Sequence, residues 1–241
     1  MEIRGNRECA DCGTRWSYYE TGEVTCPDCG SLRSVGRDDE RRLHTDGPAT
    51  FDLSSAREAL ADRPLVETAD DVREQCRRYR RRRGFVREGE LLDLDETYLV
   101  ASELEVAIGE YDRTLSSGAL DAATDDEEQL YLLSLLEIDR PPADRVPRTF
   151  ESARGLAYAR AVEEYRTDVL EWLDATDATE PAVRSALERL EDHRRRVEAL
   201  DGAVDPTTAE RLVEVAREIG RYLREGELAL ARAQDRLDSL G

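Results

Sequence analysis

Four cysteines form two matched pairs near the N-terminus of this 241-residue chain: Cys9 with Cys12, and Cys26 with Cys29. Each pair lies in a C-x-x-C segment followed directly by a glycine, and 13 residues separate the two segments. One C-x-x-C turn delivers two thiolates from a tight loop, so two turns joined by a hairpin supply the four soft donors of a tetrahedral metal site. The spacing therefore predicts one structural Zn²⁺ ion held by all four cysteines.

The same four thiolates can also hold iron. The segments read C-x-x-C-G and C-P-x-C-G and resemble those of rubredoxin, which gives an alternative: an electron-transfer module with iron in the four-cysteine site. Rubrerythrin, which joins such a module to a di-iron helical bundle, is set aside because the chain has no Glu-x-x-His pair. No nucleotide-binding, zinc-protease or serine-hydrolase motif is present, so we expect a protein that is not an enzyme.

Residues 9–30 resemble the zinc ribbon of transcription factor IIB, which is also found in many other archaeal proteins. The layout of the whole chain is similar to a haloarchaeal family described only as zinc-ribbon-containing. The resemblance implies a small β fold with zinc, and a role related to transcription is one expectation. Ribbons of this kind also occur in ribosomal proteins, enzymes and adaptors, so the resemblance does not fix the pathway.

The charge of the chain is strongly negative. All 35 basic residues are arginine, and 55 Asp and Glu residues give a net charge of −20. A dense carboxylate surface without lysine is typical of a cytoplasm rich in salt, and we expect a halophilic archaeon as the source. The Debye length at molar salt is only about 3 Å, so the net charge excludes no class of partner.

No segment is apolar enough for a signal peptide or a membrane span, so we expect a cytoplasmic protein with no membrane partner. In a reducing cytoplasm paired cysteines are metal ligands rather than disulfides.

The composition of the chain changes near residue 45, which predicts two domains: a zinc ribbon over residues 1–45 and a helical bundle over residues 49–241. In the ribbon we expect strands at 15–19, 24–25 and 32–35. So short a segment cannot bury a core of its own, so the metal must supply much of its folding energy. The residues between the domains, 37–48, carry charges, glycine and proline and indicate a linker.

Apolar residues after residue 48 recur at close to heptad spacing, which predicts helices throughout. Three stripes are Leu65, Ala69, Val72, Cys76, Tyr79; Ala101, Leu104, Ile108, Tyr111, Leu115; and Tyr158, Val162, Tyr165, Val169, Trp172. A last helix from Pro206 to Leu240 would be about 50 Å long. The expected fold class is mainly α: a small N-terminal β zinc ribbon followed by an all-α antiparallel bundle with long, coiled-coil-like helices. A homodimer through the long C-terminal helices is a further expectation.

Six arginines within seven residues interrupt the acidic pattern and form a candidate binding patch: Arg77, Arg78, Arg80, Arg81, Arg82 and Arg83. They could bind phosphate, RNA or an acidic partner. The run also ends a helix just before Gly84, where cations complement the helix dipole, and a structural role is the favoured interpretation.

Other single residues have structural interpretations. Cys76 lies on an apolar stripe, which indicates a buried thiol. We expect both histidines, His44 and His193, to be exposed to solvent. Strand alternation places Trp16 and Tyr18 on one face, packed over the metal site, and Tyr19 on the opposite face, where no role is assigned to it.

The function that these patterns indicate is a non-catalytic zinc protein whose ribbon binds an unknown macromolecule, protein or nucleic acid. The helical bundle would supply a second surface.

Overall fold

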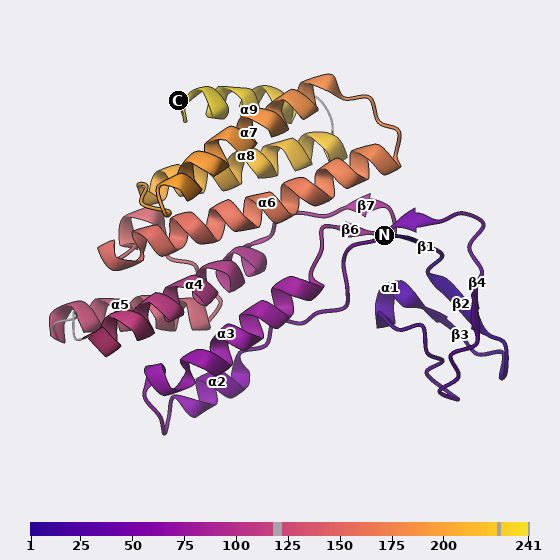
Figure 1. The fold of residues 1–241 in the computed structure, drawn as a ribbon, viewed down its shortest axis with the longest axis horizontal. Coiled ribbons are helices and arrows are strands. Elements are labelled where there is room, and N and C mark those ends of the chain that lie inside the picture. The colour runs from indigo at the N-terminus through magenta and orange to yellow at the C-terminus, as the bar shows by residue number, and fades with distance from the viewer. Residues whose placement is uncertain (118–121, 226–227, 241) are drawn as a thin grey trace.

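The computed structural model describes residues 1–117, 122–225 and 228–240. Helices make up most of the molecule, and a group of short strands lies beside them at the N-terminal end of the chain (Figure 1). The expected fold class, mainly α with a small β part at the N-terminus, is confirmed.

Three short strands form an antiparallel sheet around the cysteines, in the order β3-β2-β4. Strand β2 (Asn6–Cys9) runs into the first cysteine pair, and β3 (Arg15–Ser17) leaves it. Strand β4 (Ser34–Gly36) follows the second pair and completes the sheet. The central strand β2 was not recognised in the sequence, because four residues are too few to show a clear alternation.

Two strand predictions in this region are wrong. The strand expected over residues 15–19 ends at Ser17, because Tyr18–Thr21 form the short helix α1. Gly22 ends that helix with φ of 68°, a conformation that glycine adopts without strain. Residues 24–25 form no strand. The strand expected over residues 32–35 is present as β4, which completes the sheet beside β2.

The interpretation of residues 37–48 as a linker is also wrong. Within this segment β5 (Arg42–Leu43) pairs with β1 (Glu2–Ile3). Beyond β5, the backbone N–H of Thr45 donates to the carbonyl oxygen of Val86 at 2.9 Å. The Thr45 hydroxyl also donates to Asp168 at 2.7 Å. The segment is therefore held against the helical part. Independent folding of residues 1–45 and 49–241 remains a prediction.

The rest of the chain consists of helices with one small hairpin. Its elements are α2 (Ser54–Ala59), α3 (Leu65–Arg82), β6 (Val86–Arg87), β7 (Glu90–Leu91), α4 (Glu96–Ser117), α5 (Ala122–Leu136), two 3₁₀ turns (Ala143–Arg145 and Arg148–Phe150), α6 (Glu151–Ala175), α7 (Pro181–Ala199), α8 (Pro206–Glu225) and α9 (Leu228–Asp238). The expectation of an all-α second part therefore missed the β6–β7 hairpin. Its two turn residues, Glu88 and Gly89, both have positive φ, as a tight hairpin turn requires.

The large helices pack side by side in the order α3, α4, α6 and α8, and α7 packs against both α6 and α8 (Figure 1). The apolar stripes of the sequence lie between them. All five residues of the α3 stripe, from Leu65 to Tyr79, are buried, and so are the first four of the α6 stripe, Tyr158 to Val169. A single apolar core therefore joins these helices.

The prediction of one continuous helix from Pro206 to Leu240 is wrong. Helix α8 ends at Glu225, α9 begins at Leu228, and the two helices pack against each other. Folding back buries Ala233 and Leu237, which a straight extension would leave exposed. The sequence has glycine at 226, outside the described residues, and glycine costs about 1 kcal/mol relative to alanine in a helix.

Within the described part of the chain, no helix combines the length and the apolar character that are needed to cross a membrane.

Candidate metal centre

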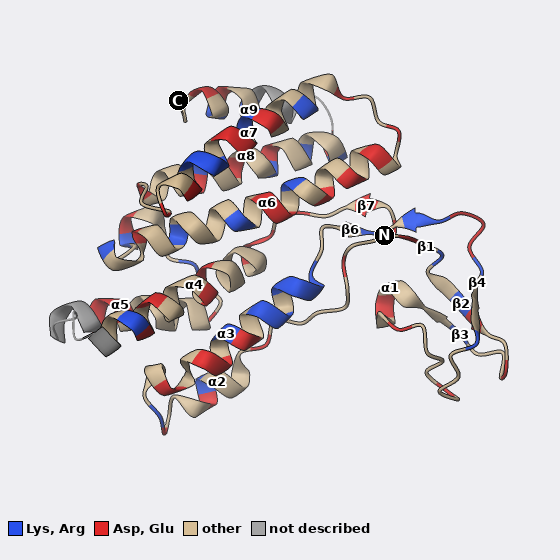
Figure 2. Ribbon diagram, viewed as in Figure 1, with Lys and Arg blue, Asp and Glu red and all other residues tan. Residues whose placement is uncertain are grey.

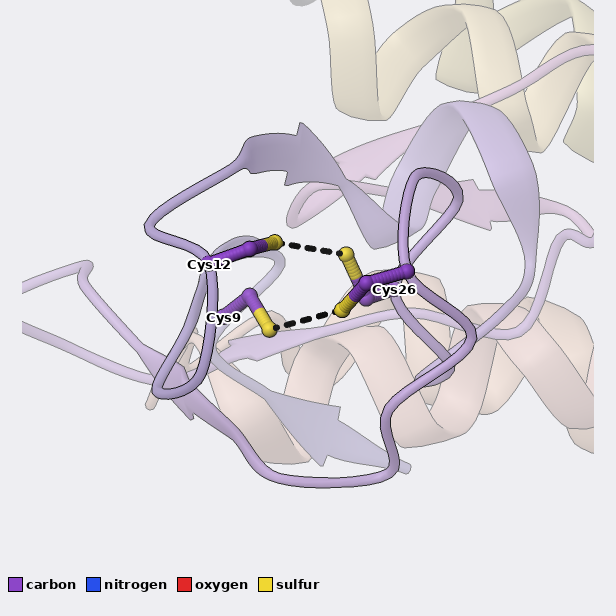
Figure 3. A group of neighbouring side chains, drawn as sticks. Cys9, Cys12 and Cys26 are labelled. Carbon is purple, nitrogen blue, oxygen red and sulfur yellow. Dashed lines mark hydrogen bonds between the residues drawn. The ribbon is translucent and has the colours of Figure 1, made fainter.

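The four cysteine side chains of the N-terminal region converge on one point. The Sγ atoms of Cys9, Cys12, Cys26 and Cys29 all lie within 4.8 Å of one another. Figure 3 shows Cys9 and Cys12 on one loop with their sulfurs directed toward those of the second loop. Two contacts between the loops are 3.6 Å long, from Cys9 to Cys29 and from Cys12 to Cys26. The structure therefore brings together all four predicted ligands.

Each cysteine pair is held in a turn with the same backbone hydrogen bonds. In the first turn, Gly13 donates to the carbonyl oxygen of Cys9 at 3.0 Å, and the Cys9 N–H donates to Thr14 at 2.9 Å. The second turn repeats both distances, with Gly30 donating to Cys26 and Cys26 donating to Ser31. The glycines have φ of 78° and 70°, which L-residues with side chains rarely adopt. The glycine after each C-x-x-C therefore closes the turn.

Side chains between the turns tie the two pairs together. Both turns read C-x-D-C-G followed by a hydroxyl residue. The Ser31 hydroxyl donates to Asp11 at 2.5 Å, and the Thr14 hydroxyl donates to Asp28 at 3.3 Å. Arg33 adds an ion pair to Asp11 at 2.9 Å. Sequence reasoning missed these partners, although the repeated six-residue pattern was a signal that could have identified them.

The sulfur spacing fits a tetrahedral metal ion. A zinc–sulfur bond is about 2.3 Å long, so the edges of a ZnS₄ tetrahedron are about 3.8 Å, close to the 3.6 Å contacts between the turns. Four thiolates also fill all positions of such a site, which leaves none for a substrate. The donor set therefore fits a closed structural centre, and Cys9, Cys12, Cys26 and Cys29 would hold the ion.

Exposure differs within each pair: Cys9 and Cys26 are buried, whereas Cys12 and Cys29 are exposed. The acidities differ as well. The pKa of Cys29 is lowered by a backbone hydrogen bond from Ser31, but the neighbouring thiols of Cys12 and Cys9 outweigh it and raise the pKa to about 12. The hydroxyl of Thr14 is the main cause that lowers the pKa of Cys12. Sulfurs this close cannot all ionise together unless a cation stabilises them.

The arginine run is divided by the structure into two sets. Arg77, Arg80 and Arg83 bind carboxylates: the first two pair with Glu105 at 3.0 and 2.7 Å, and Arg83 pairs with Asp46 at 3.0 Å. These three arginines have the structural role that the sequence favoured.

The other three arginines, Arg78, Arg81 and Arg82, are exposed and form no ion pair with any residue that the structure describes. Figure 2 shows the positive charge gathered on the C-terminal half of α3. Their role as a binding patch remains a prediction.

The prediction that His44 is exposed to solvent is wrong. His44 is buried, with 4% of its surface exposed, because the segment that carries it packs against the helical part. Tyr19, to which no role was assigned from the sequence, is also buried, and its ring meets the His44 ring edge-on with centroids 4.9 Å apart. Trp16 and Tyr18 are only partly buried. Alternation failed because the strand ends at Ser17. Cys76 is fully buried, as predicted, and His193 is partly exposed.

A buried ionic network in the helical part was not indicated by the sequence. Arg154 on α6 and Glu103 on α4 are both fully buried and pair at 2.6 Å. Tyr158 donates to the second Glu103 oxygen at 2.8 Å, and Arg154 donates to the carbonyl oxygen of Pro141 at 2.8 Å. The Tyr131 hydroxyl also bonds to Glu103. The network joins α4, α5 and α6. No pattern in the sequence distinguishes these charges from the many exposed ones.

The comparison with protein families gives one match: the model described as "Family of unknown function (DUF7117)" covers residues 1–237. The chain therefore belongs to that family, and the match includes both the cysteine cluster and the helices. Searches among curated proteins and among solved structures found no match.

Proposed function

We propose that this DUF7117 protein is a non-catalytic zinc protein whose N-terminal ribbon binds a macromolecular partner in the cytoplasm of a halophilic archaeon. The observation that carries the proposal is the convergence of four Sγ atoms within 4.8 Å of one another. Such a set holds a structural ion and offers no open coordination position. The arrangement of two C-x-x-C turns resembles the ribbon of transcription factor IIB, so a role related to transcription is part of the proposal.

The surface next to the second cysteine pair supports a docking role. Three large apolar side chains are exposed there: Val24 at 45%, Leu32 at 75% and Val35 at 53%. Ser34 links two of them, because its hydroxyl donates to Val24 at 2.9 Å and its N–H donates to Leu32 at 3.2 Å. Large exposed apolar side chains are typical of protein contacts, so a protein is the favoured partner.

The first test is elemental analysis of the protein purified from its native host. We expect one zinc per chain and a colourless protein. The variant Cys26→Ser should lose the metal, whereas Cys76→Ser should keep it, because Cys76 lies in the helical core away from the cluster. Zinc that remains in full after loss of Cys26 would refute the four-cysteine site.

Docking is tested by crosslinking in the same host. We expect Leu32→Asn to lose a partner that the native chain captures. The matched control is Leu130→Asn on α5, a leucine of similar exposure at 66%, which should keep that partner. Equal capture by both variants would place the docking surface elsewhere.

Electron transfer is the second candidate, and the exposure of two ligands favours it. The cluster reaches the surface at Cys12 and Cys29, so an iron ion there would lie close to a redox partner. A red protein that contains iron instead of zinc, with absorption that bleaches on reduction, would establish this function in place of the first.

A further inference from the structure

A hollow of about 290 Å³ lies where the N-terminal region meets the end of α3, and we call it the junction hollow. Its wall comes from Met1 and from three longer parts of the chain: Tyr18 and Thr21–Glu23, His44–Pro48, and Arg81 with Arg82. None of these residues belongs to the cysteine cluster.

Backbone contacts hold the three parts of the wall in place. The N–H of Gly47 donates to the carbonyl oxygen of Arg82 at 2.7 Å. A Cβ atom at Gly47 would lie only 3.1 Å from that oxygen, and one at Gly22 would lie 2.9 Å from the Pro48 ring. The approach at Gly22, whose φ is 68°, requires glycine, and the one at Gly47 leaves little room for a side chain. The junction hollow is therefore a built feature of the fold.

His44 lies in the wall with both of its ring nitrogens buried and without a partner among the residues that the structure describes. Only 4% of the residue is exposed, and the rings of Tyr18 and Tyr19 lie edge-on to it at 6.0 and 4.9 Å. Buried polar groups nearly always have a hydrogen-bond partner, in the protein or in something that the protein binds. A ligand in the hollow would supply the partner that the His44 imidazole lacks.

Positive charge is available at the same place. Arg81 and Arg82 line the hollow, and neither forms an ion pair within the described ranges. The buried carboxylate in the wall, Asp46, is already bound by Arg83 at 3.0 Å and by Arg87 at 2.8 Å, so it is not available to neutralise them. Glu23 is the other acidic residue in the wall. Two arginines and one histidine thus line the hollow together with Glu23, which forms no ion pair within the part of the chain that the structure describes.

We propose that the junction hollow binds the phosphate group of a small molecule, which Arg81 and Arg82 neutralise and His44 contacts by a hydrogen bond. A phosphate has three terminal oxygens that accept hydrogen bonds from several directions, which suits three donor side chains from two parts of the chain, whereas a carboxylate has only two oxygens. The volume lies at the lower end of the range for ligand pockets, about 300–1,000 Å³, so the ligand is small. This site is independent of the metal and of the docking role of the ribbon.

Calorimetric titration of the metal-loaded full chain tests the proposal. The probes are inorganic phosphate and ribose 5-phosphate, with unphosphorylated ribose as the negative control and a short single-stranded oligonucleotide as a separate arm. We expect ribose 5-phosphate to bind, and the double variant Arg81→Gln/Arg82→Gln to weaken binding at least tenfold. Arg78→Gln is the matched control, because Arg78 is exposed on the same helix but does not line the hollow. Its affinity should equal that of the native chain.

The two histidines give a second readout that does not depend on a variant folding correctly. In NMR spectra the ring signals of His44 should shift when either phosphate probe is added, whereas those of His193 on α7 should not. The absence of binding by both phosphate probes, equal affinity in the native chain and the double variant, or binding of the oligonucleotide alone would each overturn the proposal.

Discussion

Loss of the metal should unfold the N-terminal region and leave the helical part folded. The perturbation is Cys26→Ser, which removes one of the two buried ligands. Before Leu43, the buried apolar residues are only Cys9, Tyr19 and Cys26. Burial of a large side chain contributes about 1.5–3 kcal/mol, whereas binding of a structural zinc ion contributes about 10–16 kcal/mol. The metal therefore dominates the stability of this region, and Tyr19 cannot replace it.

The effect on the helical part should be small but measurable. Tyr19 is the buried ring of the ribbon that packs on His44, which is anchored to the helices, so unfolding of the ribbon removes mainly the burial of that ring from the junction. A loss of about 1.5–3 kcal/mol lowers the Tm of a chain of this size by about 3–12 °C, at about 2–4 °C per kcal/mol. Circular dichroism at 222 nm should hardly change, because α1 contributes 4 helical residues whereas α6 alone contributes 25.

The chain has two tryptophans, one in the N-terminal region and one in the helical part, so their fluorescence reports the unfolding of each part separately. Trp16 donates to the carbonyl oxygen of Glu23 in the ribbon, and Trp172 donates to Gly89 in the helical part. With Trp172→Phe as background, emission from Trp16 should shift to the red in Cys26→Ser. With Trp16→Phe as background, emission from Trp172 should stay unchanged. A cooperative loss of the 222 nm signal together with a shift of Trp172 would show that the two parts fold as one unit, and this reasoning would fail.

The remaining predictions concern the buried network, the ties between the cysteine turns, and the fifth thiol. Glu103→Gln leaves the buried Arg154 without its main counterion, so it should lower the free energy of unfolding by about 3 kcal/mol, or Tm by about 6–12 °C. The control, Glu137→Gln at an exposed position, should lower the free energy of unfolding by less than about 1 kcal/mol. Equal shifts of Tm in the two variants would contradict this prediction. Asp11→Ala removes the acceptor of the Ser31 hydroxyl and should weaken zinc binding about 10–100-fold, as measured by competition with a chelator. An unchanged zinc affinity would show that the hydrogen bond between Ser31 and Asp11 does not contribute to metal binding. Burial raises the pKa of the Cys76 thiol well above its usual range. A thiol reagent should therefore modify four cysteines after the metal is chelated, and Cys76 only after the protein is denatured. A fifth thiol that reacts rapidly in the native state would refute the burial of Cys76.

The sequence by itself determined the four-cysteine cluster and the main helices, because both depend on local spacing. Two C-x-x-C-G segments supply tight turns with the sulfurs on one side, whatever the rest of the chain does. The stripe from Leu65 to Tyr79 has the spacing of one helix face, so its burial follows from amphipathic periodicity alone. The start of α8 at Pro206 was also predicted from local sequence. The Asp205 side chain caps this helix, because it accepts a hydrogen bond from the N–H of Thr207 at 2.8 Å.

Only the tertiary structure decided which charged and polar residues are buried, because their partners lie far away in the sequence. The arginine run has one sequence pattern, yet Arg80 is bound by Glu105 while Arg81 faces the junction hollow. In the sequence His44 lies in a segment with the composition of a linker. In the structure β5, which precedes His44, pairs with β1, and the His44 ring packs against Tyr19. A charged group keeps its hydration at the surface, whereas burial removes that hydration and costs free energy unless partners compensate. The role of a charged residue therefore depends on the neighbours that folding brings to it, and the local sequence does not specify those neighbours.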